Sequence, residues 1–258
     1  MKRRFRQTYI VRYDDGDCYG FLTPAAFLHY LQDIVSLDAE DARLSGDGYW
    51  VARRTVINFA APVPVHTQLE LETFVIGMTR ITAQRSYIAR VVGTDEPLVT
   101  ARTLWVYLDA RGRPARLPEQ TAQIWLPDGP VPPQPEAAWP AFPDTPPERS
   151  SYTVRFSDTD PMQHMNNAAY VVVLDNAAWD AYAKVDLTPD AVTMHALEYD
   201  VEYVESARFG EQLEIATWLD PLPAMGQPFT RLQQIKRGES VLVRARSQWI
   251  VNNVVEER

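Results

Sequence analysis

The sequence predicts an α+β protein made of two tandem copies of one domain, each a long helix wrapped by a largely antiparallel sheet. The first observation is an internal repeat within the 258 residues. The second is that both copies run through the same order of strand-like and helix-like segments, and the third is a proline-rich segment between them. Three separated blocks keep a nearly constant offset of 143 or 144 residues; they begin at Tyr9 and Tyr152, Gln68 and Gln212, and Leu98 and Leu242.

Each copy begins with a strand that leads through a polar turn into the long helix, and four more strands follow. Thr23 is a candidate N-cap of the first helix, and Pro24 fits the first helical position. In the second helix, apolar residues such as Tyr170 and Leu174 recur at helical spacing, whereas the strands alternate, as at Leu69 and its neighbours. The predicted segments are strands 3–13, 49–60, 68–78, 81–92 and 97–108 around helix 24–43, and strands 150–157, 194–205, 211–220, 227–236 and 241–252 around helix 166–182.

The segment between the copies is a linker by composition. Residues 114–147 hold eleven of the twenty prolines, and such a stretch favours extended polyproline conformations. We therefore expect an N-terminal domain at 1–125, a proline-rich linker at 126–148 and a C-terminal domain at 149–258, with the two domains packed side by side.

Composition limits the classes of function. The net charge of −9 argues against nucleic acid as the main partner. No run of apolar residues is long enough for a membrane span, and the basic start of the chain lacks the apolar core of a secretory signal. The single cysteine, Cys18, excludes an internal disulfide and a cysteine-based metal cluster, so we expect a cytoplasmic protein. The sequence has no phosphate-binding glycine loop and no metal-ligand spacing, and we expect no cofactor and no metal.

The turn before the second helix concentrates chemically active side chains. Asp160, His164, Asn166 and Asn167 lie within eight residues, directly between a strand and a helix. The first copy repeats the aspartates but has Phe21 at the position of His164. Because a helix N-terminus presents free backbone N–H groups, such a turn can place a carboxylate and an imidazole beside an anion-binding site. The second copy is therefore the candidate catalytic copy.

With this turn, the chain resembles the hotdog-fold thioesterases, and its two fused copies resemble the acyl-ACP thioesterases that release fatty acids from acyl carrier protein. The resemblance rests on Gly20 to Thr23, His29 to Asp33 and Ala101 to Val106 in the first copy, and on Asp160 to Asn167 and Leu197 to Tyr203 in the second. It implies two tandem hotdog domains. It also implies an acyl-phosphopantetheine arm on acyl carrier protein as the substrate, with no nucleic acid, no membrane and a homodimer as one assembly.

The family's catalytic set maps onto Asp160, Met162, His164 and Glu202, and Met162 stands where the family has asparagine. The resemblance implies Asp160, His164 and Glu202 as catalytic residues. Substrate binding is expected from Met162, Gln163, Asn166 and Asn167. We expect Glu202 to activate water while Asp160 and His164 orient and polarise the site; direct attack by Asp160 is the alternative.

The first copy keeps the fold without the polar set. We expect it to form the acyl-chain tunnel, with Trp50, Val56 and Phe59 as candidate lining residues. The function indicated is hydrolysis of acyl-ACP to free fatty acid. An acyl-CoA thioesterase and a non-catalytic acyl-ligand binding protein remain as alternatives.

Overall fold

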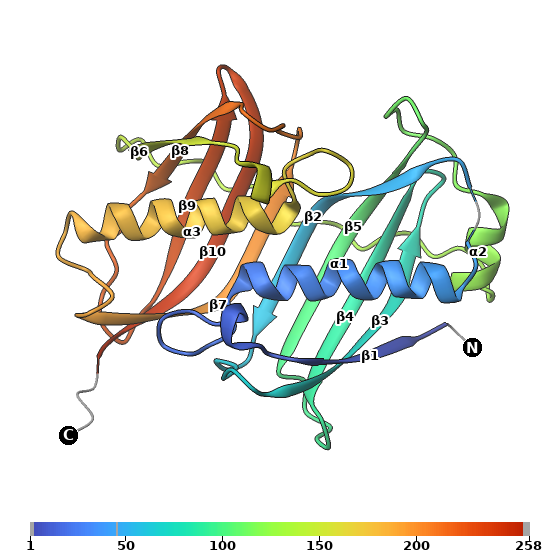
Figure 1. Ribbon diagram of the computed structural model, residues 1–258, viewed down its shortest axis with the longest axis horizontal. Helices are drawn as coiled ribbons and strands as arrows, with labels where there is room; N and C mark the ends of the chain where they lie inside the picture. Colours follow the sequence, from blue (N-terminus) through green and yellow to red (C-terminus); the bar gives the residue numbers. More distant parts are fainter. Residues whose placement is uncertain (1–2, 45, 255–258) are drawn as a thin grey trace.

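The computed structural model describes residues 3–44 and 46–254 and shows a single ten-stranded antiparallel sheet (Figure 1). Each half contributes five neighbouring strands, in the order β1-β3-β4-β5-β2-β7-β10-β9-β8-β6. The α+β class with a long helix and an antiparallel sheet in each half is confirmed. The strands are β1 (Phe5–Ile10), β2 (Tyr49–Phe59), β3 (Gln68–Met78), β4 (Thr82–Val91), β5 (Val99–Leu108), β6 (Glu148–Thr153), β7 (Val192–Tyr203), β8 (Gln212–Trp218), β9 (Pro228–Arg237) and β10 (Ser240–Asn253).

Two long helices cover one face of the sheet (Figure 1). They are α1 (Pro24–Asp41) and α3 (Asn167–Ala183), and the side chains of Thr23 and Asn166 cap their N-termini. The helices run in opposite directions, with their N-terminal parts side by side near the centre of the molecule. Strand residues that face the helices, such as Ile57 and Tyr199, are fully buried. The turns before both helices therefore lie close to the boundary between the two halves.

The two halves join through a symmetric strand pairing. Strands β2 and β7 pair antiparallel, with Arg54 opposite Glu202 and Asn58 opposite Glu198. An offset of 144 residues exchanges these two pairs, so the junction has the self-complementary form of a two-fold dimer interface. From the sequence we expect two domains side by side, and in the structure the two halves share one continuous sheet.

The linker crosses the face of the sheet opposite the helices. It follows α2 (Glu119–Trp125), whose Trp125 donates a hydrogen bond to Asp38 of α1, and then runs extended to the start of β6 at Glu148. Along this path Val131 accepts a hydrogen bond from the Met78 N–H of β3, Ala137 accepts one from Arg54 of β2, and Phe142 stacks on Trp218 of β8. We call this segment, residues 126–147, the strap. The strap crosses the strands one after another, and it covers charged side chains that would otherwise face water.

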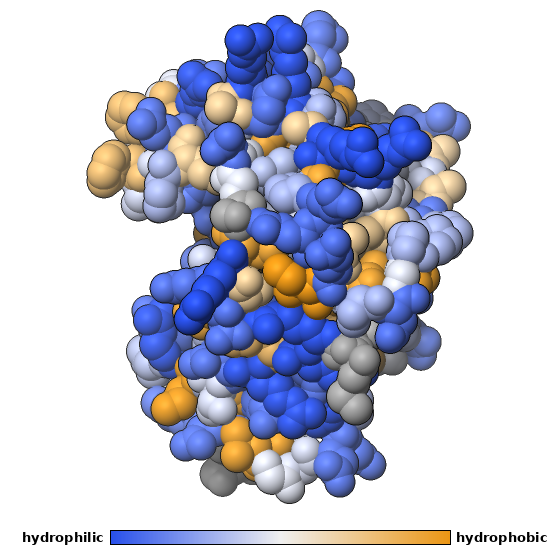
Figure 2. Space-filling view, turned by 90° about the vertical axis from the view of Figure 1, so that its right-hand side faces the viewer, coloured by the Kyte–Doolittle hydropathy of each residue, from blue (hydrophilic) through white to orange (hydrophobic). Residues whose placement is uncertain are grey.

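The end of the molecule formed by the first half is mostly hydrophilic, with a few hydrophobic clusters between the polar residues (Figure 2). None of the helices in the described part of the chain is long and apolar enough to cross a membrane.

Candidate active site

The turn before α3 is a compact loop held by its own backbone. The Asp160 N–H donates to the His164 carbonyl oxygen at 3.0 Å, and one Asp160 carboxylate oxygen accepts from the Met162 N–H at 2.9 Å. Gln163 completes the loop with φ of 61°, in the left-handed region. The equivalent residue in the first half is Gly20, with φ of 80°, for which this conformation carries no side-chain penalty. The second half therefore keeps a strained non-glycine residue beside its candidate catalytic groups.

Asn166 and Asn167 begin the helix that follows. The Asn166 side-chain oxygen accepts from the Ala168 N–H at 2.9 Å, as an N-cap does. The Asn167 carbonyl oxygen accepts a hydrogen bond from the Tyr203 hydroxyl at 3.1 Å, and burial raises the pKa of Tyr203, which keeps this donor protonated. Within the described residues the Asn167 N–H has no hydrogen-bond partner, as expected at the first helical position. It is a candidate donor to an oxyanion.

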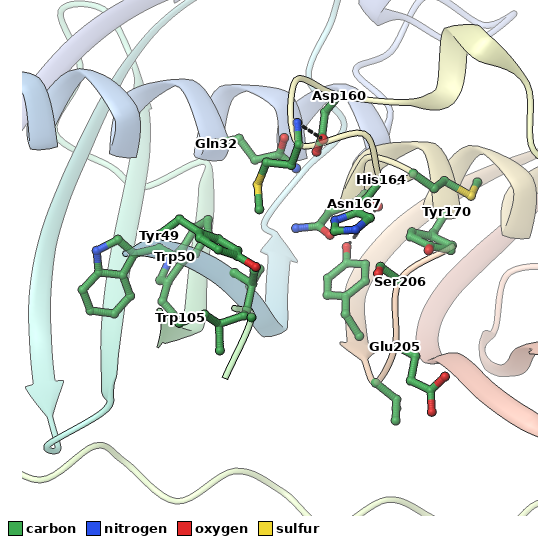
Figure 3. Close-up of a pocket in the computed structure, with 18 of the residues that line it drawn as sticks. Gln32, Tyr49, Trp50, Trp105, Asp160, His164, Asn167, Tyr170, Glu205 and Ser206 are labelled. Atoms are coloured by element: carbon green, nitrogen blue, oxygen red, sulfur yellow. Dashed lines mark hydrogen bonds between the residues drawn. The ribbon is translucent and has the colours of Figure 1, made fainter. Parts of the chain in front are cut away.

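A cavity of about 1050 Å³ opens beside this turn and lies between the two halves. Figure 3 shows Asp160, His164 and Asn167 on one side of it and Tyr49, Trp50 and Trp105 on the other, with Gln32 above and Glu205 and Ser206 below. The second half supplies the polar turn and the loop after β7, while α1, β2 and β5 of the first half supply an apolar wall. Residues of that wall include Val35, Ala39, Trp50, Ala52 and Trp105.

Most of the predicted site residues lie together. Asp160, Met162, His164 and Asn167 line the cavity, and Asn166 caps the helix directly behind it. Gln163 is exposed at the tip of the turn. The catalytic and binding roles of these residues stay predictions.

Glu202 lies on the other face of the sheet, away from the cavity. The residues that alternate with it, Val201 and Tyr203, are buried on the helix side, and Tyr203 lines the cavity. Glu202 instead forms ion pairs with Arg53 at 3.0 Å and Arg244 at 2.7 Å. The geometry therefore does not support the expectation that Glu202 activates water in this site. The carboxylates on the cavity wall are those of Asp160 and Glu205.

The three candidate tunnel residues lie in different places. Trp50 lines the cavity, whereas Phe59 lines a second, smaller cavity of about 410 Å³. Val56 lines neither of these two cavities; it pairs with Asp200 across the junction of β2 and β7.

The second cavity occupies the equivalent position in the first half, and its chemistry is different. Phe21 and Pro24 stand where the active-site cavity has His164 and Asn167, so this turn lacks both an imidazole and the N–H of the first helical residue. Asp17 and His195 face the second cavity. Burial raises the pKa of Asp17 and lowers that of His195, which favours the uncharged form of each. The equivalent turn is thus not equipped for the same chemistry.

Sequence reasoning missed three residues of the site, namely Gln32, Tyr203 and Glu205. Alternation along 199–203, with Tyr199, Val201 and Tyr203 on one face, carries a signal that would have placed Tyr203 inside and Glu202 outside. Gln32 has no such signal because its position depends on how the two halves meet, and Glu205 has none because it lies in the irregular loop after β7. The described residues include no group of three or more His, Cys, Asp or Glu side chains that could hold a metal ion.

Two family models match the chain, one in each half. Residues 2–124 match the family model of the acyl-ACP thioesterase N-terminal domain, and residues 154–248 match that of the thioesterase-like superfamily. An acyl-[acyl-carrier-protein] hydrolase from Cuphea viscosissima, FATB2, is 23% identical over 271 residues, covering 96% of this chain. The chain spans 63% of the length of that relative.

Solved structures share the whole fold. A 12:0-ACP thioesterase from Umbellularia californica superposes with a TM-score of 0.79 at 18% identity, covering 96% of this chain and 94% of that one. An acyl-ACP thioesterase from Bacteroides thetaiotaomicron superposes with a TM-score of 0.75 at 18% identity, covering 95% of this chain and 97% of that one.

The fold and the two sequence matches define a thioesterase-like protein built from two fused hotdog domains. The first half of the chain is thus similar to the acyl-ACP thioesterase N-terminal domain and the second half to the thioesterase-like superfamily, and the whole fold is shared with the solved acyl-ACP thioesterases.

Proposed function

We propose that this protein hydrolyses the thioester that joins a fatty acyl chain to the phosphopantetheine arm of acyl carrier protein. The observation that carries the proposal is the cavity between the halves, because it places the polar turn of the second half against the apolar wall of the first. An acyl thioester needs both environments. Its hydrocarbon chain gains free energy from burial, whereas its carbonyl needs a base and a donor to the oxyanion.

Positive charges around the cavity are suited to binding the phosphate of the carrier's phosphopantetheine arm. Arg111, Arg208 and Arg237 line the cavity, and Arg208 is exposed. Arg237 binds the loop after β7 by donating to the Ser206 carbonyl oxygen at 3.2 Å and to Glu211 at 2.7 Å. Exposed arginines at such a position can bind the phosphate of phosphopantetheine. The acyl chain then extends along α1 towards Trp50.

In the proposed reaction, a water molecule attacks the thioester carbonyl carbon. Asp160 and His164 orient this water, and one of them accepts its proton as the new C–O bond forms. The carbonyl oxygen takes the negative charge and accepts a hydrogen bond from the Asn167 N–H at the start of α3. When the C–S bond breaks, the phosphopantetheine sulfur takes a proton and leaves as a thiol, and the free fatty acid remains.

A panel of acyl-ACPs and acyl-CoAs of different chain lengths tests the proposal, with release of free thiol as the readout. We expect turnover on acyl-ACPs and higher kcat/KM on them than on the matching acyl-CoAs. Preference for acyl-CoA would favour the acyl-CoA thioesterase, and binding without turnover on both classes would favour the acyl-ligand binding protein.

Three substitutions test the residues. Asp160→Asn and His164→Ala should each lower kcat by about 10²–10⁴-fold, the usual contribution of a general acid or base. Glu202→Gln is the matched control and should keep kcat, because Glu202 lies on the far face of the sheet. All three should unfold cooperatively. A large loss of kcat in Glu202→Gln, or wild-type kcat in either of the others, would contradict the assignment made from the geometry.

The choice between water attack and direct attack by Asp160 needs a separate experiment. In a single turnover in ¹⁸O water, label in an enzyme carboxylate shows direct attack through an anhydride that water opens at the Asp160 carbonyl, whereas water attack on the thioester leaves the label only in the fatty acid.

A further inference from the structure

Gln32 reaches from the first half into the site of the second. It lies on α1, is half-buried and lines the active-site cavity, where Figure 3 shows it beside Asp160. The side-chain nitrogen of Asn166 donates a hydrogen bond to the Gln32 side-chain oxygen at 2.8 Å, and the Gln32 nitrogen donates a longer one back to the Asn166 oxygen at 3.5 Å. A residue of the half without the catalytic turn therefore binds the N-cap of the helix that follows this turn.

The helix cap and the contact with Gln32 require the same orientation of the Asn166 amide. An asparagine side chain has one end that accepts and one that donates, and its two orientations fill nearly the same space. The Ala168 N–H can only donate, so the Asn166 oxygen faces it at 2.9 Å, and the Asn166 nitrogen is left to donate to the Gln32 oxygen. The reversed amide would place two nitrogen donors together at the helix N-terminus. Gln32 thus stabilises the cap that sets the position of Asn167.

The equivalent position in the first half makes no such link. Residues 143 apart in the sequence pair Gln32 with Asp175 and Asn166 with Thr23, the same offset that pairs Pro24 with Asn167 at the helix starts. Thr23 caps α1 by accepting from the Ala26 N–H at 3.1 Å, whereas Asp175 accepts hydrogen bonds from Arg231 and Tyr199; within the described residues no hydrogen bond joins Thr23 and Asp175. The contact between helix and N-cap therefore occurs only beside the turn that carries His164.

We propose that Gln32 is a positioning residue for thioester hydrolysis, supplied by the half that lacks the catalytic turn. It holds the Asn166 cap so that the Asn167 N–H and the His164 ring face the thioester carbonyl. The inference rests on the proposed function and deepens it, because one active site then needs residues from both halves. A residue that acts in this way affects the chemical step more than the binding of the acyl chain.

Two substitutions of Gln32 separate its hydrogen bond from its volume. Gln32→Met keeps the size of the side chain and removes the acceptor. We expect kcat on the preferred acyl-ACP to fall about tenfold and KM to change less than about threefold, as for loss of one hydrogen bond that positions the reacting groups. Gln32→Glu keeps an oxygen acceptor for Asn166 and should retain most of the wild-type kcat. Asn176→Ala, at an exposed position of α3, is the control and should leave kcat and KM unchanged.

Two further measurements on each variant complement the kinetics. They are the melting temperature of the protein and the rate of hydrogen exchange at the Ala168 N–H. Gln32→Met should fold with a similar melting temperature and exchange this amide faster, since the cap is loosened. Wild-type kcat in Gln32→Met, or an equal loss in Gln32→Glu and Gln32→Met, would overturn the role of Gln32 while wild-type hydrolysis stands. Absence of hydrolysis by the wild-type protein on the whole thioester panel would instead overturn the proposed function.

Discussion

His164 and Phe21 occupy equivalent positions in two turns with the same backbone, yet only one turn can do acid–base chemistry. In both turns an aspartate accepts a backbone N–H two residues later, at Met162 in one case and Tyr19 in the other. The difference lies in the side chains placed on this backbone. Pro24 adds a second difference, because proline has no N–H to offer at the start of α1. Replacing Phe21 with histidine alone would therefore leave the first turn without its oxyanion donor.

His195 in the second cavity makes the stability of the protein depend on pH. Burial lowers the pKa of His195, while the nearby Asp17 carboxylate opposes this shift; Asp175 also lines the cavity and is paired with Arg231. The unfolded chain therefore binds the proton more readily, and the free energy of unfolding must fall as pH drops from 7 towards the lowered pKa. We expect His195→Val, which introduces the residue found at equivalent position 51, to flatten this pH dependence.

Urea denaturation at pH 7, 6 and 5 measures the effect, with His66→Asn at an exposed position as the control. An unchanged slope of unfolding free energy against pH in His195→Val would show that His195 does not contribute.

Single residues of the site could be predicted from the sequence only in part. The turn from Asp160 to Asn167 is local, so its cavity-lining residues could be predicted together. Glu202 was misplaced because a resemblance named the residue without saying which face of β7 carries it. Side chains alternate between the two faces of a strand, so the buried neighbours of Glu202 show which face it lies on. Here this alternation predicts the position of Glu202 better than the match to a motif does.

At the scale of elements, periodicity and the repeat predicted all ten strands and both long helices. Most boundaries agree to within two residues, as for β3 at Gln68–Met78. The pairing of β2 with β7 and the path of the strap could not be predicted in the same way. Both depend on contacts between segments far apart in the sequence, and the strap has neither hydrophobic periodicity nor a strand pattern.

Strand β2 contributes Trp50 to the apolar wall of the cavity. Its ring lies 5.2 Å from that of Tyr107 and 6.2 Å from that of Trp125, on the side of the cavity opposite His164 (Figure 3). We expect Trp50→Ala to shift the preference to longer acyl chains, changing the ratio of kcat/KM between neighbouring chain lengths by about tenfold or more, since one methylene in an apolar pocket is worth about 1–3 kcal/mol.

A panel of saturated acyl-ACPs measures this preference. Met194→Ala, at the equivalent position of the second cavity, is the matched control and should leave the preference unchanged. An unaltered chain-length profile in Trp50→Ala would mean that another residue ends the tunnel.

At the scale of the whole molecule, a buried ion pair joins the halves across the symmetric junction. Arg54 donates two hydrogen bonds to Asp200, at 2.8 and 2.7 Å, and both side chains are almost fully buried. We expect Arg54→Met to lower the free energy of unfolding by about 3–5 kcal/mol because Asp200 loses its principal partner, and Arg54→Met combined with Asp200→Leu to recover much of that loss.

Guanidinium denaturation measures these values and also tests the continuity of the sheet. The wild-type protein should unfold in one transition, since neither half has an independent edge at β2 or β7. Two separate transitions would show that the halves fold independently despite their shared sheet.

The strap has a consequence for assembly. A sheet with one bare face can bind a second copy of itself face to face, but here residues 126–147 lie across that face and the Trp139 ring covers the guanidinium groups of Arg54 and Arg244. The sheet also ends in two short strands, β1 and β6, of six residues each, and short edge strands disfavour pairing with another chain. By covering the junction, the strap leaves the helix-bearing side as the broad surface through which two such proteins could meet.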